Sequence, residues 1–203
     1  MLDKLTAEAY LGRTHLWIWR YLTNALIEKP DVAESARVFF TLTLRSHMDE
    51  AFLHLSRLFD PKRGTLSLRM LLQCAETNAG MFEKADAASV RSALVPKLRL
   101  SLEKMGKQVR PVLNRRNKIL AHLDPRTATD FAAVAKDSAI TLGEMESLYA
   151  NSGDMVNEIS NLYRGSSNAM EIIGWDDFRR MVELMDRGRK ADLDELEGKY
   201  GGV

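Results

Sequence analysis

The sequence has a single cysteine, Cys74, and no long apolar run. One cysteine cannot form an internal disulfide or a cluster of thiolate metal ligands, so nothing supports an exported, disulfide-stabilised protein. The N-terminal residues lack the basic and apolar segments of a signal peptide, and no window approaches the roughly 18 apolar residues of a membrane span. We therefore expect a cytoplasmic protein that does not associate with membranes.

Several common catalytic motifs are missing as well. The chain has no phosphate-cradling glycine loop, no nucleophile elbow and no zinc signature. His47, Glu50 and His54 have the spacing of one helix face and form a conceivable metal site. Because their segment is heavily apolar and no further ligand is specified, we interpret them as polar residues that face solvent or another helix. We expect no metal and no cofactor.

The 203 residues, 45% of them hydrophobic, suffice for one substantial domain. Apolar residues recur at helical spacing almost throughout, and no segment alternates like a strand. The sequence predicts an all-α antiparallel bundle of about four core helices with additional short helices. We expect a single domain over residues 1–190 and a flexible tail over 191–203. The expected helices cover about residues 4–28, 31–59, 67–77 and 86–123, a fifth begins at 141 and either continues to 165 or breaks near Gly153, and a last one begins at 176 or 177.

Two helix starts have the spacing of a capping box. Asp31 precedes Glu34 by three residues, and Thr141 precedes Glu144 by the same interval.

Positive charge is concentrated in one part of the chain. The net charge is only +1, yet residues 91–126 hold ten Lys and Arg against two acidic residues, which leaves −7 for the remainder. Such a run is often a solvated helix face, and the alternative is a surface that attracts the phosphates of nucleic acid. Lys107 and Arg110 belong to this run and are candidate phosphate-binding residues.

Arg116 occupies a position where the helix pattern predicts an apolar residue. The stripe before it includes Val109 and Val112, and Ile119 follows it. At about 100° per residue, Arg116 lies in the middle of this stripe. Burying an unpaired guanidinium is very costly, so Arg116 needs a carboxylate, a bound anion or a wet cleft. Two readings remain open: an ion pair with a neighbouring helix, for example through Asp49 or Glu50, and a phosphate-binding arginine.

His122 follows six residues after Arg116. In a straight helix this means about 9 Å along the axis and about 120° around it, so one helix does not direct both side chains to one phosphate. Either the helix loosens before Asp124, or a second copy supplies the missing half. Arg115 and Lys118 share the face of His122, and such cations lower a histidine pKa toward the range suited to proton transfer. A lone histidine near a helix end can equally be a capping or packing residue.

The segment "RNKILAH" resembles the signature of HEPN domains, in which an arginine and a polar residue precede a histidine by a short interval. HEPN domains are all-α bundles of prokaryotic defence and toxin systems. The longer phrase "RNKILAHLD" and its flanking sequences look most like the HEPN subfamily named after U-type abortive-infection proteins. The resemblance covers about residues 35 to 165.

This resemblance implies metal-independent RNA cleavage by a dimer whose two signatures line one cleft and whose product ends in a 2′,3′-cyclic phosphate. Arg116 would hold the scissile phosphate, Asn117 would orient the pair or contact RNA, and His122 would act as general base or general acid. Arg115 and Lys118 would assist electrostatically, and Arg115 also satisfies the looser spacing of the signature arginine. The partners implied are RNA, a second copy and an antitoxin or regulatory protein.

Two other functions remain in view. The same bundle could bind a nucleotide, RNA or a partner without catalysis, or it could be a scaffold whose basic segment complements acidic ones such as "DLDELEG".

Overall fold

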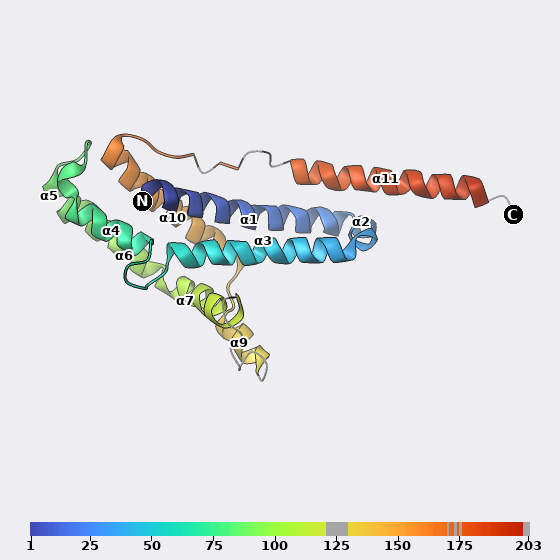
Figure 1. Cartoon of the computed structure of the whole chain (residues 1–203), viewed down its shortest axis with the longest axis horizontal. Helices are drawn as coiled ribbons and strands as arrows, with labels where there is room; N and C mark the ends of the chain where they lie inside the picture. Colours follow the sequence, from blue (N-terminus) through green and yellow to red (C-terminus); the bar gives the residue numbers. More distant parts are fainter. Residues whose placement is uncertain (121–129, 170, 173, 175, 201–203) are drawn as a thin grey trace. The chain divides into compact units, whose positions relative to one another are not determined.

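The computed structural model describes residues 1–120, 130–169, 171–172, 174 and 176–200. All regular secondary structure in these residues is helical, which confirms the prediction of an all-α fold (Figure 1). None of these helices combines the length and the apolar character of a membrane span. The residues group into two compact units. Unit 1 comprises Met1–Arg13 and Asp49–Met170, and unit 2 comprises Thr14–Met48 and Glu171–Val203.

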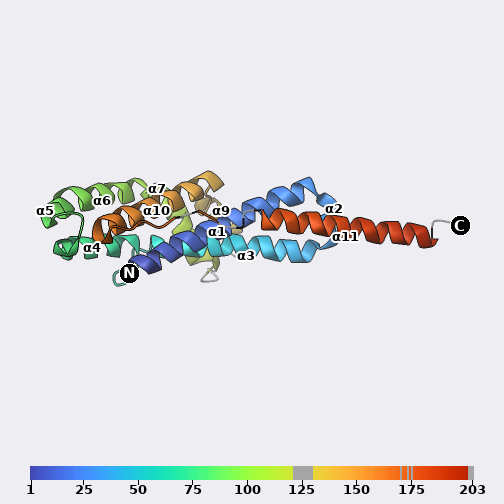
Figure 2. The same cartoon turned by 90° about the horizontal axis from the view of Figure 1, so that it is seen from above.

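The unit boundaries fall within two long helices, α1 (Leu2–Glu28) and α3 (Arg37–Leu58), which contribute to both units. Unit 1 adds the helices that carry the candidate site. They are α4 (Leu68–Thr77), α5 (Ala87–Ser89), α6 (Val95–Lys104), α7 (Gly106–Arg115), α9 (Phe131–Asp137) and α10 (Leu142–Arg164). In this unit α10 contacts α4 and α7, and α4 lies beside α6 (Figures 1 and 2).

Helices α1, α3 and α10 meet in unit 1 at Gly12. A Cβ atom at Gly12 would overlap the ring and hydroxyl of Tyr149 and approach Cβ of His54. Tyr149 is buried, and its hydroxyl donates to the carbonyl of Ala51 on α3. His54 is buried too, and its Nδ1 lies 2.7 Å from Oε2 of Glu8 on α1. The glycine is therefore required by the close approach of the three helices.

Unit 2 is built from the second part of α1, α2 (Pro30–Ser35), the first part of α3, and α11 (Asp177–Tyr200). Its core contains Leu22, Leu26, Val32, Phe40 and Val182. Trp17 stacks on Tyr21 and meets Phe178 of α11 edge-on, so α11 packs on the earlier helices through aromatic as well as aliphatic contacts.

Local signals predicted some helix starts and not others. The capping box of Thr141 and Glu144 is confirmed at the start of α10, which continues to Gly165, a residue with φ 69°. The capping box of Asp31 and Glu34 is wrong, because Pro30 already begins α2. The expected helix over 31–59 is interrupted at Ala36, whose φ of −137° and ψ of 42° are not helical.

The expected helix over 86–123 is a succession of shorter elements. A π-helical turn, η2 (Val90–Leu94), precedes α6, a junction at Met105 separates α6 from α7, and a second π turn, η3 (Arg116–Leu120), follows. Helix α9 was not predicted. The region expected to be a flexible tail from residue 191 is helical as far as Tyr200.

We expect Gly12→Ala to lower the free energy of unfolding by about 1–3 kcal/mol, because the added methyl group overpacks the contact with Tyr149. Urea denaturation measures the change. Gly188→Ala in α11 is the matched control, since nothing lies within 4 Å of the position that its Cβ atom would take. It should instead stabilise by about 0.5–1 kcal/mol through helix propensity. Equal stability of Gly12→Ala and the wild type would contradict the packing described here.

Candidate functional site

The basic segment of unit 1 packs through an apolar stripe on α6 and α7. Leu98, Met105, Val109 and Val112 are buried along this stripe. Arg116 follows on the same face as the first residue of the π turn η3. The Arg116 side chain is 22% exposed, so the guanidinium is largely withdrawn from water.

Two hydrogen bonds hold the Arg116 guanidinium. Nη1 donates to Oδ2 of Asp60 at 2.8 Å, and Nε donates to Oδ1 of Asn117 at 2.9 Å. A guanidinium has five N–H groups. Among the described residues no further hydrogen bond of Arg116 is found, so three of its N–H groups have no partner there.

Asp60 is held in place by the turn that follows α3. Its Oδ1 accepts from the backbone N–H of Lys62 at 2.9 Å, which is the geometry of an Asx turn. The other oxygen, Oδ2, is thereby directed to Arg116. The Asp60 side chain is 18% exposed, so the pair is partly desolvated on both sides. An ion pair with Asp60 thus takes the place of the pair suggested for Asp49 or Glu50.

The π turn changes the geometry on which the sequence argument depended. Residues Arg116–Leu120 form i to i+5 hydrogen bonds, and such a turn contains more residues than an α turn. The rotation of about 120° expected over six residues of straight helix therefore does not apply after Arg116. His122 itself lies outside the described residues.

Arg115 is held mainly by packing. Its guanidinium carbon lies 4.3 Å from the centre of the Phe52 ring, a cation–π contact. The ion pair of its Nη2 with Oδ1 of Asp49 is long, at 3.8 Å. Its Nε is buried and has no hydrogen-bond partner among the described residues. Arg115 thus buttresses α7 against α3, and this assignment favours Arg116 as the signature arginine.

Lys118 and Asn114 attach α9 to the site. Nζ of Lys118 lies 3.3 Å from Oδ2 of Asp137, and the Asn114 amide donates to the Asp137 carbonyl at 3.0 Å. Asp137 is the last residue of α9, so this helix is tied to α7 and η3 by side-chain contacts.

Lys107 and Arg110 are exposed on the solvent side of α7. Close to them, two cavities of unit 1 share Arg69, Leu102 and Gly106 as lining residues. The larger, of about 500 Å³, lies between α4 and α6, and the smaller, of about 140 Å³, is lined by Phe59 and Pro61 on either side of Asp60. The smaller cavity therefore borders the turn that carries Asp60.

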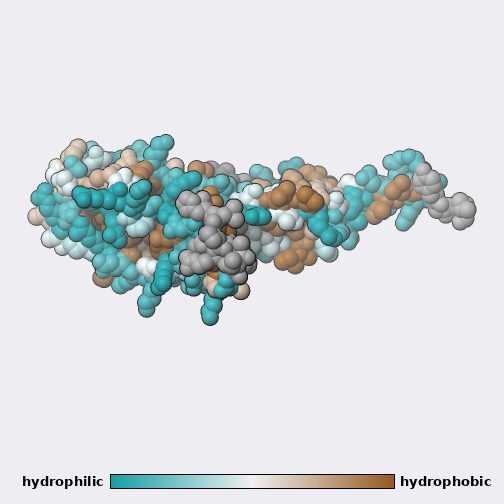
Figure 3. All heavy atoms as spheres, turned by 60° about the horizontal axis from the view of Figure 1, so that its bottom comes forward, coloured by the Kyte–Doolittle hydropathy of each residue, from teal (hydrophilic) through white to brown (hydrophobic). Residues whose placement is uncertain are grey.

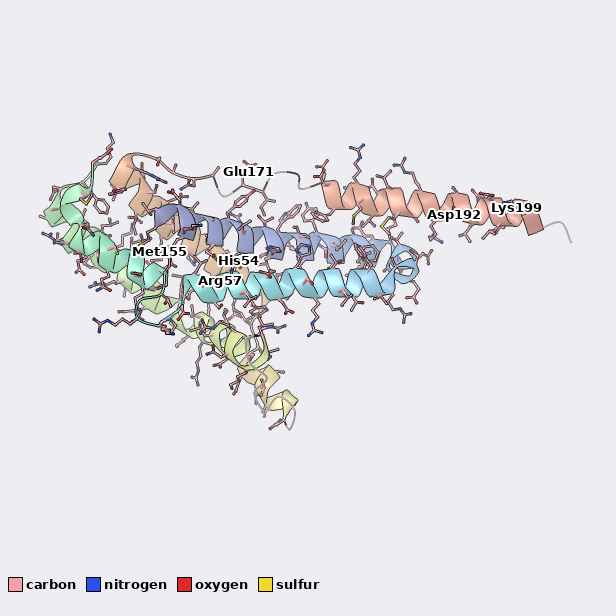
Figure 4. All side chains as sticks on the ribbon, viewed as in Figure 1. His54, Arg57, Met155, Glu171, Asp192 and Lys199 are labelled. Atoms are coloured by element: carbon pink, nitrogen blue, oxygen red, sulfur yellow. The ribbon has the colours of Figure 1, made fainter. Side chains whose placement is uncertain are left out.

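The residues weighed as a metal site have other partners. His54, labelled in Figure 4, lies on α3. Its Nδ1 is close to Glu8, and its Nε2 lies 3.9 Å from Glu50. In unit 2, Nδ1 of His47 lies 2.9 Å from Nδ1 of His15, and burial lowers the pKa of His47. Among the residues that the structure describes, no three potential ligands gather around a metal position.

Asp60 and Asp137 are the residues that sequence reasoning missed. Asp137 ends a helix that was not expected. Asp60 stands in "FDPKRG", just after the expected helix over residues 31–59, and an aspartate before a proline at a helix end is typical of a side chain held by a local turn. Its pairing with a residue 56 positions away has no local signal.

We expect Asp60→Asn to lower the free energy of unfolding by about 1–2 kcal/mol, because it leaves the Arg116 charge without a counter-ion in a partly buried place. Added inorganic phosphate should restore part of the loss by binding the folded state. Denaturation with and without phosphate measures both effects. Asp137→Asn, at an exposed partner of Lys118, should cost less than about 1 kcal/mol and respond less to phosphate. An Asp60→Asn variant as stable as the wild type would show that Arg116 does not need this carboxylate.

Comparisons with known proteins agree with the resemblance found in the sequence. The family model HEPN_AbiU2, described as AbiU2, matches residues 1–181, a longer range than the 35 to 165 expected from the sequence phrases. The comparisons with curated proteins and with solved structures gave no match. A match over most of the chain, together with the all-α fold, confirms the relationship. The chain therefore belongs to the AbiU2 family of HEPN domains, a family whose name connects it with abortive infection.

Proposed function

We propose that this protein is a metal-independent endoribonuclease of the toxin or phage-defence type, acting in the cytoplasm as a homodimer. The observation that carries the proposal is the state of Arg116: a partly buried guanidinium, oriented by Asn117, with three N–H groups free among the described residues. Membership of the AbiU2 family supports it, because the residues that follow Arg116 complete the HEPN signature.

Arg116 binds the scissile phosphate in this proposal. A guanidinium can donate two parallel N–H groups to two phosphate oxygens, and it stabilises the charge that develops there during cleavage. The Asp60 carboxylate holds the side chain in the resting site. When RNA binds, the phosphate either joins or replaces this carboxylate, so little reorientation of Arg116 is needed.

His122 moves the protons. As general base it removes the proton of the ribose 2′-hydroxyl, whose oxygen then attacks the adjacent phosphorus. The bond from phosphorus to the 5′-oxygen of the next nucleotide breaks, and this oxygen takes a proton from the imidazolium of His122 or of its counterpart in the second copy. The products are a 2′,3′-cyclic phosphate and a 5′-hydroxyl, and the reaction requires no metal.

The second copy completes the site. Two signatures facing each other across a two-fold axis provide one imidazole as base and one as acid, together with two arginines for one phosphate. A nuclease of this kind needs control in its own cell, and an antitoxin or regulatory protein that covers the basic surface would provide it.

RNA approaches over the basic surface of unit 1. Lys107 and Arg110 are exposed on α7, and Arg69 lines both cavities next to the Asp60 turn. Contacts of this kind bind the backbone of RNA without reading its sequence, so they position the strand for cleavage at Arg116.

The ion pair of Arg116 with Asp60 also favours a second candidate, an HEPN module that binds RNA or a nucleotide without cleaving it. In that case Arg116 exchanges its carboxylate for a phosphate, and no proton is transferred. Salt-sensitive RNA binding without any cleavage would identify this function.

We expect the purified protein to cleave RNA equally well with and without EDTA. Arg116→Ala should lower the cleavage rate by about 10²–10³-fold, since it removes the group that stabilises the phosphate charge. His122→Ala should lower it by about 10²–10⁴-fold through the loss of proton transfer. Gel analysis of an end-labelled RNA measures the rates, and a substrate with a 2′-deoxyribose at the cleaved position should remain intact.

Arg179→Ala is the control, because Arg179 forms an exposed ion pair with Glu183 in unit 2 and takes no part in the site. It should cleave like the wild type. If structured and unstructured RNAs remain uncut, and neither Arg116→Ala nor His122→Ala relieves growth inhibition on expression, the nuclease proposal is wrong.

RNA binding should depend on Lys107 and Arg110. Their double alanine variant should bind more weakly, and the slope of log affinity against log salt should shrink by about 0.7 for each lost phosphate contact on single-stranded RNA. Fluorescence anisotropy on a labelled, uncleavable RNA measures both. The matched control, Lys4→Ala with Arg187→Ala, removes the same charge from exposed positions elsewhere. Equal losses in both variants would indicate a general charge effect rather than a binding surface.

A further inference from the structure

Helix α11 of unit 2 consists of an anchored half and a half without intramolecular packing. In the anchored half, Val182 is buried in the core. Asp186 is buried as well, and its Oδ2 accepts from Nζ of Lys29 at 3.0 Å and lies 3.0 Å from Nζ of Lys190. These ammonium groups hold the pKa of the Asp186 carboxyl well below its usual range. Arg189 continues the attachment with an ion pair to Asp31.

The second half, residues 191–199, is here called the overhang. Every residue of the overhang is exposed. Within unit 2 the overhang extends past the segment that joins α1 to α3 (Figures 1 and 2). Asp192 and Lys199 of the overhang are labelled in Figure 4. It nevertheless carries two leucines on one face, Leu193 at 45% exposure and Leu196 at 53%, about 60° apart around the helix.

The overhang is poorly suited to stand alone as a helix. It contains two aspartates and a glycine, which are weak helix formers, and no tertiary contact compensates for them in the described part of unit 2. A surface that covers Leu193 and Leu196 would supply the missing stabilisation.

A second unpartnered apolar surface lies on α3 of the same unit and is here called the α3 face. It consists of Val38, Phe39 and Leu42, which are 72%, 55% and 58% exposed. Figure 3 shows brown, apolar surface over the part of unit 2 that contains α2 and the beginning of α3, and a smaller brown area on the outer part of α11. Phe40, by contrast, points into the core, so the α3 face is left over after α3 has packed.

The two surfaces have opposite charge. The overhang has four acidic residues and one lysine, a net charge of −3. Asp192 and Glu197 border its two leucines, each about 40° from one of them around the helix. Residues 34–48, which include the first part of α3, contain two arginines and Glu34, a net charge of +1. Arg37 is paired with Glu34 at the edge, and Arg45 follows Leu42 along the exposed side.

We propose that the overhang of one copy packs on the α3 face of a second copy, with Leu193 and Leu196 against Val38, Phe39 and Leu42. The overhang has nine residues and the segment 37–48 of α3 has twelve, so they span about 14 Å and about 18 Å of helix, which allows full overlap. The overhang cannot reach the α3 face of its own chain, because α11 continues without a break away from it. A two-fold axis repeats the contact, so that each copy gives one overhang and receives one.

Sedimentation velocity of the full chain, without RNA and over a range of concentrations, tests this interface. The measured oligomeric state does not depend on whether the protein cleaves RNA. The wild type should form a dimer. Leu193→Glu with Leu196→Glu, and separately Phe39→Glu with Leu42→Glu, should each raise the dissociation constant on the order of 100-fold, since they place charges in the apolar contact. All four residues are exposed, so circular dichroism should show unchanged folding. An equal mixture of the two double variants should dimerise better than either alone, because one of the two contacts is intact in the mixed dimer.

The matched control is Leu11→Glu with Leu184→Glu, which changes two exposed leucines outside both surfaces and adds the same charge. It should dimerise like the wild type. Two results would overturn the interface: a wild type that is monomeric at every concentration, or a dimer whose dissociation constant is unchanged by the overhang substitutions or by the α3 substitutions. In the second case the copies pair through another surface, such as the signatures of unit 1 in the proposed nuclease dimer.

Discussion

The pairing of the Arg116 guanidinium with the Asp60 carboxylate is the interaction on which the candidate site depends. A charged group at a stripe position of α7 and η3 cannot be withdrawn from water without a partner, because desolvation of a guanidinium costs several kcal/mol. Asp60, in the turn after α3, is this partner. Its Oδ2 accepts from Arg116, while its Oδ1 accepts from the N–H of Lys62. This one ion pair therefore links the end of α3 and the turn that follows it to η3.

The same pairing explains how a structural contact can serve an anion-binding site. The pair is partly open to solvent, so its net contribution to stability is modest and far below the cost of leaving either charge buried alone. In the proposed function a phosphate would offer Arg116 a negative charge with more acceptor oxygens, and the hydrogen bond to Asn117 would keep the guanidinium plane in place during the exchange. The carboxylate keeps the site assembled in the absence of substrate, and this preorganisation reduces the cost of binding.

Sequence patterns predicted what depends on neighbours in the chain. The helical period gave the all-α fold and the odd position of Arg116, and the spacing of Thr141 and Glu144 gave the start of α10. These patterns did not predict the helix interruptions or the contacts between residues that are far apart in the sequence. The apolar period runs on across Ala36 and Met105, so it did not predict the interruptions there, although Gly106 beside Met105 is a weak helix former. The identity of Asp60 as the partner of Arg116 depends on how α3 and α7 pack, which no local spacing encodes.

The near-zero net charge of the chain hides two local fields of opposite sign. Charges are screened over about 8 Å at physiological salt, so a partner responds to the surface it approaches and not to the total of +1. The basic run of residues 91–126 can therefore attract phosphates while the acidic overhang of α11 attracts a basic, apolar helix. In the two proposals, RNA approaches the basic run and a second copy approaches the overhang, where a net charge of −3 disfavours RNA. Segregation of charge would thus let one chain carry two binding surfaces with different partners.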